Sequence, residues 1–183
     1  NRSWGYQSFD VAYKTTSDLV RKLVDIASKG GNFLLNVGPD ERGRFPAEAK
    51  ERLAGVGRWM PFNDDSIHGT RASPFSTLEW GRCTRASLPG GGERLYLHVF
   101  DRPEDGVIRL PGLLTLPMHE AAYLLAAPGA GRLAVERDGA ERINLIITTA
   151  RERHSTRGHT HRHERRHERP RDTHWSLRRR ASA

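Results

Sequence analysis

The segment of residues 16–39 constrains the fold more than any other, because it joins an amphipathic helix to a short stretch that is apolar on both sides. Between residues 16 and 29 the apolar side chains recur at helical spacing, at Leu19, Leu23 and Ile26. Thr16 or Ser17 would cap the start of this helix, and Gly30-Gly31 would end it. Residues 32–37 (NFLLNV) follow, with three consecutive apolar residues between asparagines. This pattern predicts a strand that is buried on both faces, as in a parallel sheet covered by helices.

A second helix is expected after this strand. Pro46 suits its first position, and Ala49, Leu53, Val56 and Met60 share one face. The order helix, strand, loop, helix is typical of α/β sheets and barrels, in which ligands bind at the loops after the strands. Residues 36–45 form that loop here.

The pattern changes after residues 63–65, and we place a boundary near residues 70–75. Short apolar and alternating segments are then separated by Pro- and Gly-containing turns, which predicts an antiparallel β-sandwich. The expected strands are 94–100, 107–110, 121–126, 132–137 and 141–148.

The chain's charge is concentrated at its C-terminal end. Residues 151–183 contain eleven arginines and four acidic residues, which give +7 of the formal net charge of +8. The same stretch holds six of the nine histidines and almost no aliphatic residue, so we expect a disordered tail. A metal-binding tract, an RNA-binding segment and a shifted reading frame are alternative interpretations of this stretch.

Further features bound the class of protein. Cys83 is the single cysteine, so the chain can form no internal disulfide, and we expect a small buried thiol. No apolar run is long enough for a transmembrane helix. The sequence begins at Asn1 with a structural pattern already under way, and we expect a fragment whose beginning, including any export signal, is missing. The sequence therefore assigns no cellular location.

Three motifs go beyond architecture. They are residues 3–6 (SWGY), residues 29–39 (KGGNFLLNVGP) and residues 63–70 (NDDSIHGT), in this order. Together they resemble the C-terminal part of the α-L-fucosidases of glycoside hydrolase family 29. Glu51-Arg52-Leu53 and Trp59 match the helix between the last two motifs. Pro61-Phe62 departs from the family pattern and is expected to disturb the end of that helix.

The resemblance implies an α/β plus all-β architecture. Residues 1–72 would be the C-terminal portion of a (β/α) TIM-like barrel, residues 73–150 an antiparallel β-sandwich, and residues 151–183 the disordered basic tail. A barrel needs about 250 residues, so residues 1–72 supply only its last part. In this fragment a strand apolar on both sides would lack neighbours, and we expect exposed apolar surface and poor solubility.

The same resemblance implies a retaining glycosidase that acts on fucosylated glycans. One carboxylate attacks the anomeric carbon and a second carboxyl group protonates the leaving oxygen. In the family both precede the SWGY segment, so no catalytic residue is expected within this chain. Trp4 and Tyr6 are candidate substrate-binding residues, because aromatic rings cover the apolar face of a sugar. Asn36, at the end of the predicted strand, would hold the active-site loop or contact the sugar.

Other chemistry-bearing side chains have simpler explanations. Asp40 and Glu41 lie in the loop after the predicted strand, but adjacent turn residues usually point apart, and we favour a structural role. His68 is interpreted as a packed or capped linker residue, and His98 and Trp80 as sheet or core residues. Asp10 and Asp18 are interpreted as a loop residue and a helix-start charge. Neither a metal nor an organic cofactor is implied.

Two alternative functions belong to other classes. The chain could be a carbohydrate-binding or scaffold module whose sandwich binds glycan without chemistry. A nucleic-acid-binding protein is the second alternative, and it depends wholly on the tail, since residues 1–150 carry a net charge of only +1.

Overall fold

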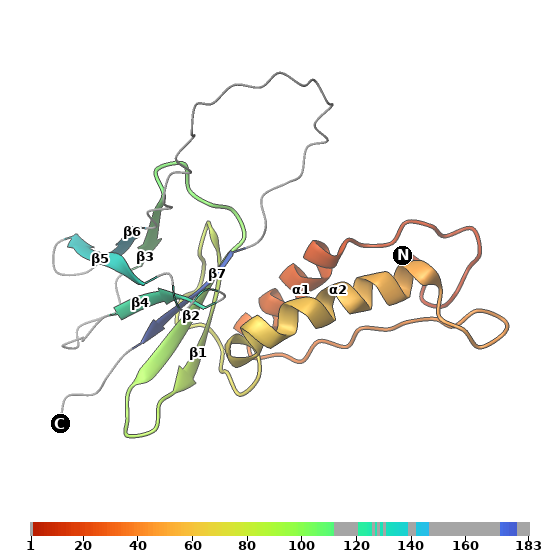
Figure 1. Cartoon of the computed structure of the whole chain (residues 1–183), viewed down its shortest axis with the longest axis horizontal. Coiled ribbons are helices and arrows are strands. Elements are labelled where there is room, and N and C mark those ends of the chain that lie inside the picture. Colours follow the sequence, from red (N-terminus) through yellow and green to blue (C-terminus); the bar gives the residue numbers. More distant parts are fainter. Residues whose placement is uncertain are drawn as a thin grey trace, which may run out of the picture.

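The computed structural model describes residues 2–111, 121–125, 127, 129, 131–138, 142–146 and 173–178. Within these residues two helices lie beside an antiparallel sheet (Figure 1). Both helices run toward the sheet, and the chain between them returns alongside in an extended conformation (Figure 1). The two helices and the extended segment between them thus run in alternating directions, as helices and strands do in an α/β unit.

The first predicted helix is confirmed as α1 (Thr16–Ser28). Its N-cap is Thr15, not Thr16 or Ser17, because the Thr15 hydroxyl accepts a hydrogen bond from the backbone N–H of Asp18. The Asp18 carboxylate accepts one from the Thr15 N–H in return, which completes a capping box. Asp18 is thus a helix-start charge, as expected. Gly30, with φ of +77°, ends the helix in the left-handed conformation.

The second helix, α2 (Ala47–Asn63), is longer than its sequence suggests. It continues through Pro61 and is followed directly by the short 3-10 helix η1 (Asp64–Ser66). The expected disturbance at Pro61 is therefore wrong. Proline fixes φ at a value that a helix uses, and in the last turn it removes only one intrahelical hydrogen bond.

The strand predicted at residues 32–37 is not assigned as a strand. The segment is nevertheless extended and alternates regularly, because Phe33, Leu35 and Val37 are half-buried whereas Leu34 and Asn36 are exposed. A parallel strand needs hydrogen-bonded neighbours, and the described residues provide none for this segment. The expected exposure of apolar surface is confirmed, since Leu34 is 91% exposed.

Seven strands form the sheet. Five correspond to strands expected from the sequence, whereas the first and the last were not expected. Their order is β1-β2-β7-β4-β5-β6-β3, and all neighbours are antiparallel. The strands are β1 (Gly81–Ser87), β2 (Glu93–Val99), β3 (Val107–Leu110), β4 (Ala121–Leu124), β5 (Arg132–Asp138), β6 (Arg142–Ile146) and β7 (Thr173–Arg178).

Strand β7 lies inside the stretch predicted to be a disordered tail, so that prediction is wrong for Thr173–Arg178. This strand pairs with both β2 and β4, and Trp175 lies opposite Leu97 and Leu124. The reason is local: Thr173, Trp175 and Leu177 alternate with polar residues at strand period, although the surrounding composition is Arg- and His-rich. Residues 151–172 and 179–183 lie outside the described residues.

The sheet encloses the main core. Leu95 and Leu97 of β2 pack in one cluster with Ile108 and Leu110 of β3, although these strands are far apart in the sheet order. The sheet therefore curls over its own apolar face. Cys83 is fully buried here, so the expected small buried thiol is confirmed, and burial raises the pKa of this thiol to about 12.

Hydrogen bonds between charged and polar groups connect helix α1 to the sheet. Asp25 of α1 accepts a hydrogen bond from Arg82 Nε of β1 at 2.6 Å and another from Lys29 Nζ at 2.7 Å. Arg21 donates to the carbonyl of Phe100 at 2.6 Å and lies 5.1 Å from the centre of its ring. These contacts fix the helices on one edge of the sheet.

A second, fully buried contact joins η1 to the sheet. The Thr84 hydroxyl donates to the Ser66 carbonyl at 2.7 Å and lies 3.2 Å from His98 Nε2. His98 and Trp80 are thus core residues of the sheet, as expected, with Trp80 Nε1 donating to the Arg109 carbonyl. Buried polar groups that are satisfied across two elements make their relative position specific.

Candidate functional site

The motif segments 3–6 and 35–38 lie side by side, although 32 residues separate Trp4 from Asn36 in the chain. The side-chain amide of Asn36 donates a hydrogen bond to the backbone carbonyl of Trp4 at 2.7 Å. A Cβ added at Gly38 would lie only 2.5 Å from Tyr6 N. Glycine at position 38 is therefore required by the close approach of the two backbones.

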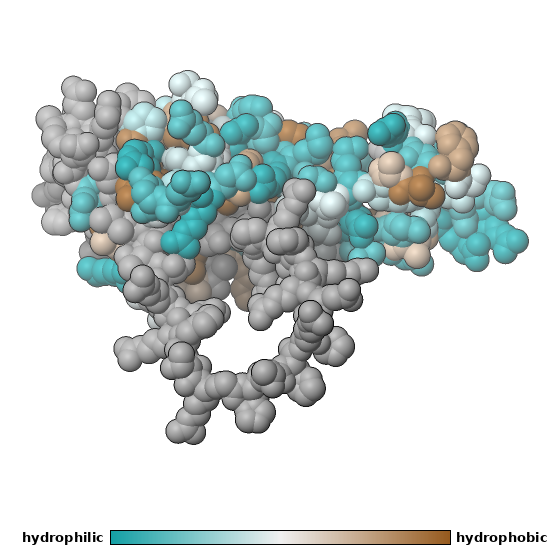
Figure 2. Space-filling view, turned by 90° about the horizontal axis from the view of Figure 1, so that it is seen from above, coloured by the Kyte–Doolittle hydropathy of each residue, from teal (hydrophilic) through white to brown (hydrophobic). Residues whose placement is uncertain are grey.

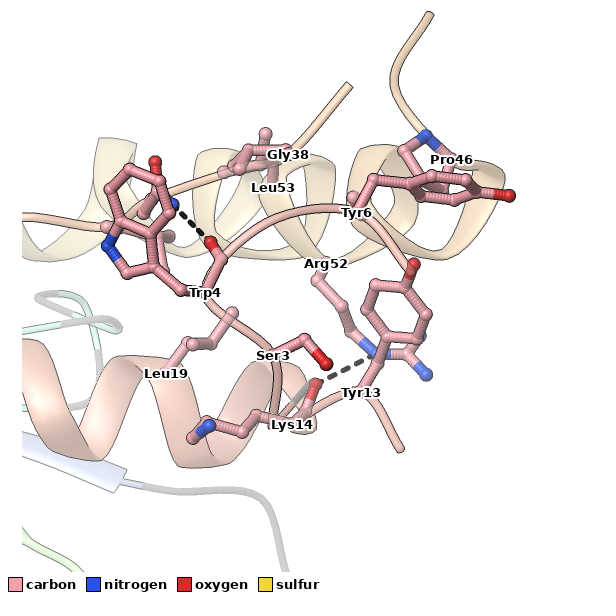
Figure 3. A pocket seen from close by; sticks show the side chains of 14 residues that line it. Ser3, Trp4, Tyr6, Tyr13, Lys14, Leu19, Gly38, Pro46, Arg52 and Leu53 are labelled. Atoms are coloured by element: carbon pink, nitrogen blue, oxygen red, sulfur yellow. Dashed lines mark hydrogen bonds between the residues drawn. The ribbon is translucent and has the colours of Figure 1, made fainter. Parts of the chain in front are cut away.

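A cavity of about 240 Å³ opens between these segments and the two helices (Figure 3). Apolar side chains of both helices and residues of the two motif segments line it. Its lining comprises Ser3, Trp4, Tyr6, Tyr13, Lys14, Leu19, Leu35, Asn36, Val37, Gly38, Pro46, Ala49, Arg52 and Leu53.

The three residues selected from the sequence, Trp4, Tyr6 and Asn36, all line this cavity. The Trp4 ring is 91% exposed, and Tyr6 lies beside Pro46 at the start of α2 (Figure 3). Segment 3–6 also alternates, since Ser3 and Gly5 are half-buried whereas Trp4 and Tyr6 are exposed. Their proximity follows from the fold, whereas their role toward a sugar stays a prediction.

The polar side of the cavity consists of residues that the sequence reasoning missed, namely Tyr13, Lys14 and Arg52. Arg52 Nε donates to the Lys14 carbonyl at 3.2 Å, which links α2 to the segment before α1. Burial, followed by the charge of Glu48, raises the pKa of Tyr13. The spacing along α2 could have indicated Arg52 as a cavity residue, because Arg52 follows Ala49 by three residues and therefore shares its helix face.

Asp10 is held in a loop beside the site and has no catalytic geometry. Its Oδ2 accepts hydrogen bonds from the backbone N–H groups of Arg2 at 2.8 Å and Ser3 at 2.6 Å. Hydrogen bonding from Ser3 is the main reason that the pKa of Asp10 is lowered. The expected loop role of Asp10 is confirmed.

Asp40 is likewise a structural acid. Its carboxylate accepts the backbone N–H groups of Arg42 at 2.9 Å and Arg44 at 2.8 Å, and also the Arg44 guanidinium. The hydrogen bond from the Arg44 backbone contributes most to lowering the pKa of Asp40. Glu41 is exposed beside it. The two carboxylates therefore form no acid/base pair, as the sequence favoured.

The remaining candidates lie away from the cavity. His68 is exposed and contacts the Asp64 carboxylate through Nδ1, which agrees with a capped linker residue. Among the described residues, no group of three or more His, Cys, Asp or Glu side chains is arranged to hold a metal ion. In the same part of the chain, neither helix combines the length and apolarity that a membrane crossing needs.

Large exposed apolar side chains occur in the helical part of the molecule. Figure 2 shows apolar residues at the end of the helical part far from the sheet. Among the residues whose burial the structure describes, the large exposed apolar ones fall between positions 4 and 62, namely Trp4, Tyr6, Phe9, Val11, Leu34, Phe45, Leu53 and Phe62.

Known proteins provide an independent comparison. Residues 1–65 match the sequence model of the family described as Alpha-L-fucosidase. The chain is 34% identical over 110 residues to an α-L-fucosidase of Dictyostelium discoideum. This match covers 59% of this chain and 23% of that protein. It is 32% identical over 117 residues to the tissue α-L-fucosidase of Homo sapiens, covering 62% of this chain and 24% of that protein.

The solved structure of α-L-fucosidase isoenzyme 1 from Paenibacillus thiaminolyticus agrees with these matches. It superposes with a TM-score of 0.75 and 34% sequence identity, covering 99% of this chain and 38% of that chain. The family resemblance read from the sequence motifs is thus confirmed. The chain spans about a quarter of the length of the curated relatives that it matches.

Proposed function

Because residues 1–65 match the α-L-fucosidase family, we propose that this chain is the C-terminal part of a retaining α-L-fucosidase, which hydrolyses terminal α-L-fucosyl linkages in glycans. The observation that carries the proposal is the convergence of Trp4, Tyr6 and Asn36 on one cavity. They come from two of the three motifs that carry the family resemblance. Asn36 also lies near the end of the extended segment 32–37, and an α/β barrel binds its ligand at the ends of its strands.

In this proposal Trp4 is the platform for the sugar. Its ring is exposed and apolar, and it would cover the C–H face of fucose. The Asn36 amide nitrogen is engaged by the Trp4 carbonyl, so Asn36 fixes the main chain of that platform. The Tyr6 hydroxyl would donate or accept a hydrogen bond with a sugar hydroxyl group, and the Asn36 amide oxygen would accept one.

The two reacting carboxyl groups would come from outside this chain. A retaining glycosidase needs a nucleophilic carboxylate and an acid/base carboxyl group about 5 to 5.5 Å apart. The lining of the cavity includes no Asp or Glu among the described residues. Asp10 and Asp40 are both occupied by backbone N–H donors. We therefore expect the chain to be inactive by itself.

The domain division is part of the same proposal. Residues 1–72 would complete the barrel, with residues 32–37 as one of its strands, and the antiparallel sheet would be the C-terminal domain. The regular alternation of half-buried and exposed residues at 33–37 supports a strand role, because it has the period of two that a strand imposes.

The alternative of a separate carbohydrate-binding sheet is less well supported. Trp80 and Tyr96 of the sheet are 7% and 3% exposed, so neither offers a platform to a glycan. Among the residues whose burial the structure describes, the exposed aromatic rings lie in the helical part, at Trp4, Tyr6, Phe9, Phe45 and Phe62. No specific observation therefore favours a binding site on the sheet.

A chimera tests the proposal. The part of the Paenibacillus thiaminolyticus enzyme that this chain does not match would be joined to this chain, and hydrolysis of 4-nitrophenyl α-L-fucoside would be measured. We expect turnover by the chimera, retention of anomeric configuration in the product, and no turnover by this chain alone.

Substitutions within the chimera test the sugar site. Trp4→Ala should raise KM several-fold, whereas Phe9→Ala, which changes an exposed ring outside the cavity lining, should not. Fucose release by this chain alone, abolished by substitution of one of its own carboxylates, would contradict the proposal.

A further inference from the structure

A second hollow, an open groove of about 500 Å³, lies between α1 and the sheet. Residues of one face of α1 line it from the helix, and Arg82 of β1 and Phe100 line it from the sheet. Lys14, just before α1, lines both this groove and the cavity described above. Figure 3 shows the Lys14 side chain pointing away from Tyr6 and Pro46. The groove and the cavity therefore adjoin each other near the start of α1.

The groove carries an excess of positive charge. Its cations are Lys14, Arg21, Lys22 and Arg82, and its acids are Asp18 and Asp25. These side chains sum to +2, whereas residues 1–150 as a whole carry only +1, so the positive charge is concentrated here. A hollow lined by an excess of one sign of charge raises the local concentration of ions of the other sign.

Both acids of the groove are engaged by groups of the chain itself. Asp18 accepts the N–H and the hydroxyl of Thr15 in the capping box. Asp25 accepts hydrogen bonds from Lys29 and Arg82. By contrast, Lys22 is exposed, and its ammonium group makes no hydrogen bond or ion pair within the described part of the chain. The excess charge is therefore directed to solvent.

The guanidinium groups of the groove are held in place by an aromatic ring. The Cζ atoms of Arg21 and Arg82 lie 5.1 Å and 5.8 Å from the centre of the Phe100 ring. Arg82 donates to Asp25 through Nε and to the Gly81 carbonyl through Nη1, and a guanidinium has five N–H donors in all. Its side chain is 37% exposed, so the other donors can reach a ligand.

We propose that this groove binds an anionic group, a sulfate ester or a carboxylate, of an oligosaccharide. The inference rests on the proposed function, because a glycan whose terminal fucose occupies the cavity would pass Lys14 and enter the groove. Its anionic group would then meet Lys22 and Arg82, and planar guanidinium groups suit the paired oxygens of such anions. The substrates would accordingly be acidic fucosylated glycans.

Isothermal titration calorimetry of the full chain tests the groove. The probes are three tetrasaccharides: chondroitin 4-sulfate, with sulfate esters and carboxylates, unsulfated chondroitin, with carboxylates only, and neutral chitotetraose. We expect the sulfated sugar to bind and chitotetraose not to bind. Binding of unsulfated chondroitin with equal affinity would assign recognition to the carboxylate, and its failure to bind would assign it to the sulfate ester. Binding of no probe, or of all three alike, overturns the inference.

A matched pair of variants locates the binding site, because residues 151–183, with a net charge of +7, also attract anions. Lys22→Gln removes a cation of the groove and should raise the Kd of the sulfated sugar about fivefold, as the loss of one ion pair in water predicts. Lys50→Gln removes an exposed lysine of α2 outside both linings and should leave the Kd unchanged. Both variants should keep the circular dichroism spectrum of the unsubstituted chain. Equal effects in the two variants overturn the inference.

A nucleic acid is the competing ligand for a basic groove. Octathymidylate would be titrated into the same two variants. If Lys22→Gln weakens the binding of octathymidylate more than that of the sulfated sugar, the groove belongs to nucleic acid and the inference is overturned.

The outcome is separable from that of the proposed function, because 4-nitrophenyl α-L-fucoside carries no anionic group. Turnover by the chimera, without sugar binding that depends on Lys22, supports the activity and overturns the groove. Sugar binding that depends on Lys22, without turnover by the chimera, supports the groove and counts against the activity.

Discussion

At the scale of single residues, the acids of the motif region shape the loops beside the cavity. The Asp40 carboxylate accepts two backbone N–H groups and the Arg44 guanidinium, which closes a tight turn. The Asp10 carboxylate accepts the backbone N–H groups of Arg2 and Ser3 in the segment that leads to Trp4. Both carboxylates have a lowered pKa because hydrogen bonds favour their ionised form. At neutral pH the two carboxylates are therefore ionised and stabilise the conformations of their loops.

Asp40→Ala should release the turn of residues 40–44, because the backbone N–H groups of Arg42 and Arg44 lose their acceptor. Amide hydrogen exchange at these two residues should become faster. Glu41→Ala is the control: it removes the neighbouring exposed acid and should leave exchange unchanged. Equal exchange in the two variants would show that the carboxylate of Asp40 does not hold the turn.

The same turn should respond to pH. Folding lowers the pKa of Asp40 below its ordinary value of 3.8, so the ionised carboxylate favours the folded turn. Protection of Arg42 and Arg44 should thus be complete above pH 3.8 and decline as the pH falls through the lower pKa of the folded state.

At the scale of secondary-structure elements, the cavity depends on how closely the two helices approach. Gly55 of α2 is buried, and a Cβ added there would lie 2.4 Å from Thr16 Oγ1 at the start of α1. Gly57, two residues later, is exposed and has nothing within 4 Å of the same position. The two glycines therefore differ only in whether a helix faces them.

Gly55→Ala and Gly57→Ala should change stability in opposite directions. Alanine at position 57 should stabilise the protein by about 0.5–1 kcal/mol, because it lowers the entropy lost on helix formation. Alanine at position 55 should destabilise it by about 1–3 kcal/mol, because Thr16 must move. Urea unfolding measures both free energies. A stabilising Gly55→Ala would show that α1 and α2 do not meet at this point.

At the scale of the whole molecule, the helical part and the sheet form one unit through polar contacts. Asp25 bridges Arg82 and Lys29 at the outer edge of the contact, while Thr84 and Ser66 meet where the residues are fully buried. A detached sheet module would not need these contacts. The cavity rim is thereby held at a fixed position relative to the sheet.

Asp25→Asn should lower the free energy of unfolding by about 1 kcal/mol at neutral pH, since it weakens both charge-assisted hydrogen bonds. Glu51→Gln removes an acid whose ion pair with Arg52 lies within α2 and should change stability by less than about 0.5 kcal/mol.

The effect of Asp25→Asn should depend on pH. The hydrogen bond from Lys29, with Arg82 adding to it, lowers the pKa of Asp25 below 3.8. The contribution of Asp25 is therefore present above pH 3.8 and is lost as the pH falls through the folded-state pKa. Urea unfolding of both proteins across this range measures it. If the difference in free energy of unfolding between the two proteins stays constant down to the lowest pH, the charge of Asp25 does not stabilise the contact between α1 and the sheet.

The sequence by itself determined the elements whose signals are local. Helical spacing, a polar cap and Gly30 were enough for α1, and period-two alternation was enough for most strands of the sheet. It also revealed the resemblance to the α-L-fucosidases, through SWGY and KGGNFLLNVGP in combination. The choice of Trp4, Tyr6 and Asn36 as candidates came from these motifs.

Only the tertiary structure decided how distant segments meet. The polar side of the cavity at Tyr13, Lys14 and Arg52 required the packing of α2 against the chain before α1. Strand β7 required partners on β2 and β4, whereas residues 32–37 pair with no other described segment despite a stronger apolar pattern. The physical reason is that a helix closes its hydrogen bonds within itself, whereas a strand closes them on other segments, whose position a local pattern does not contain.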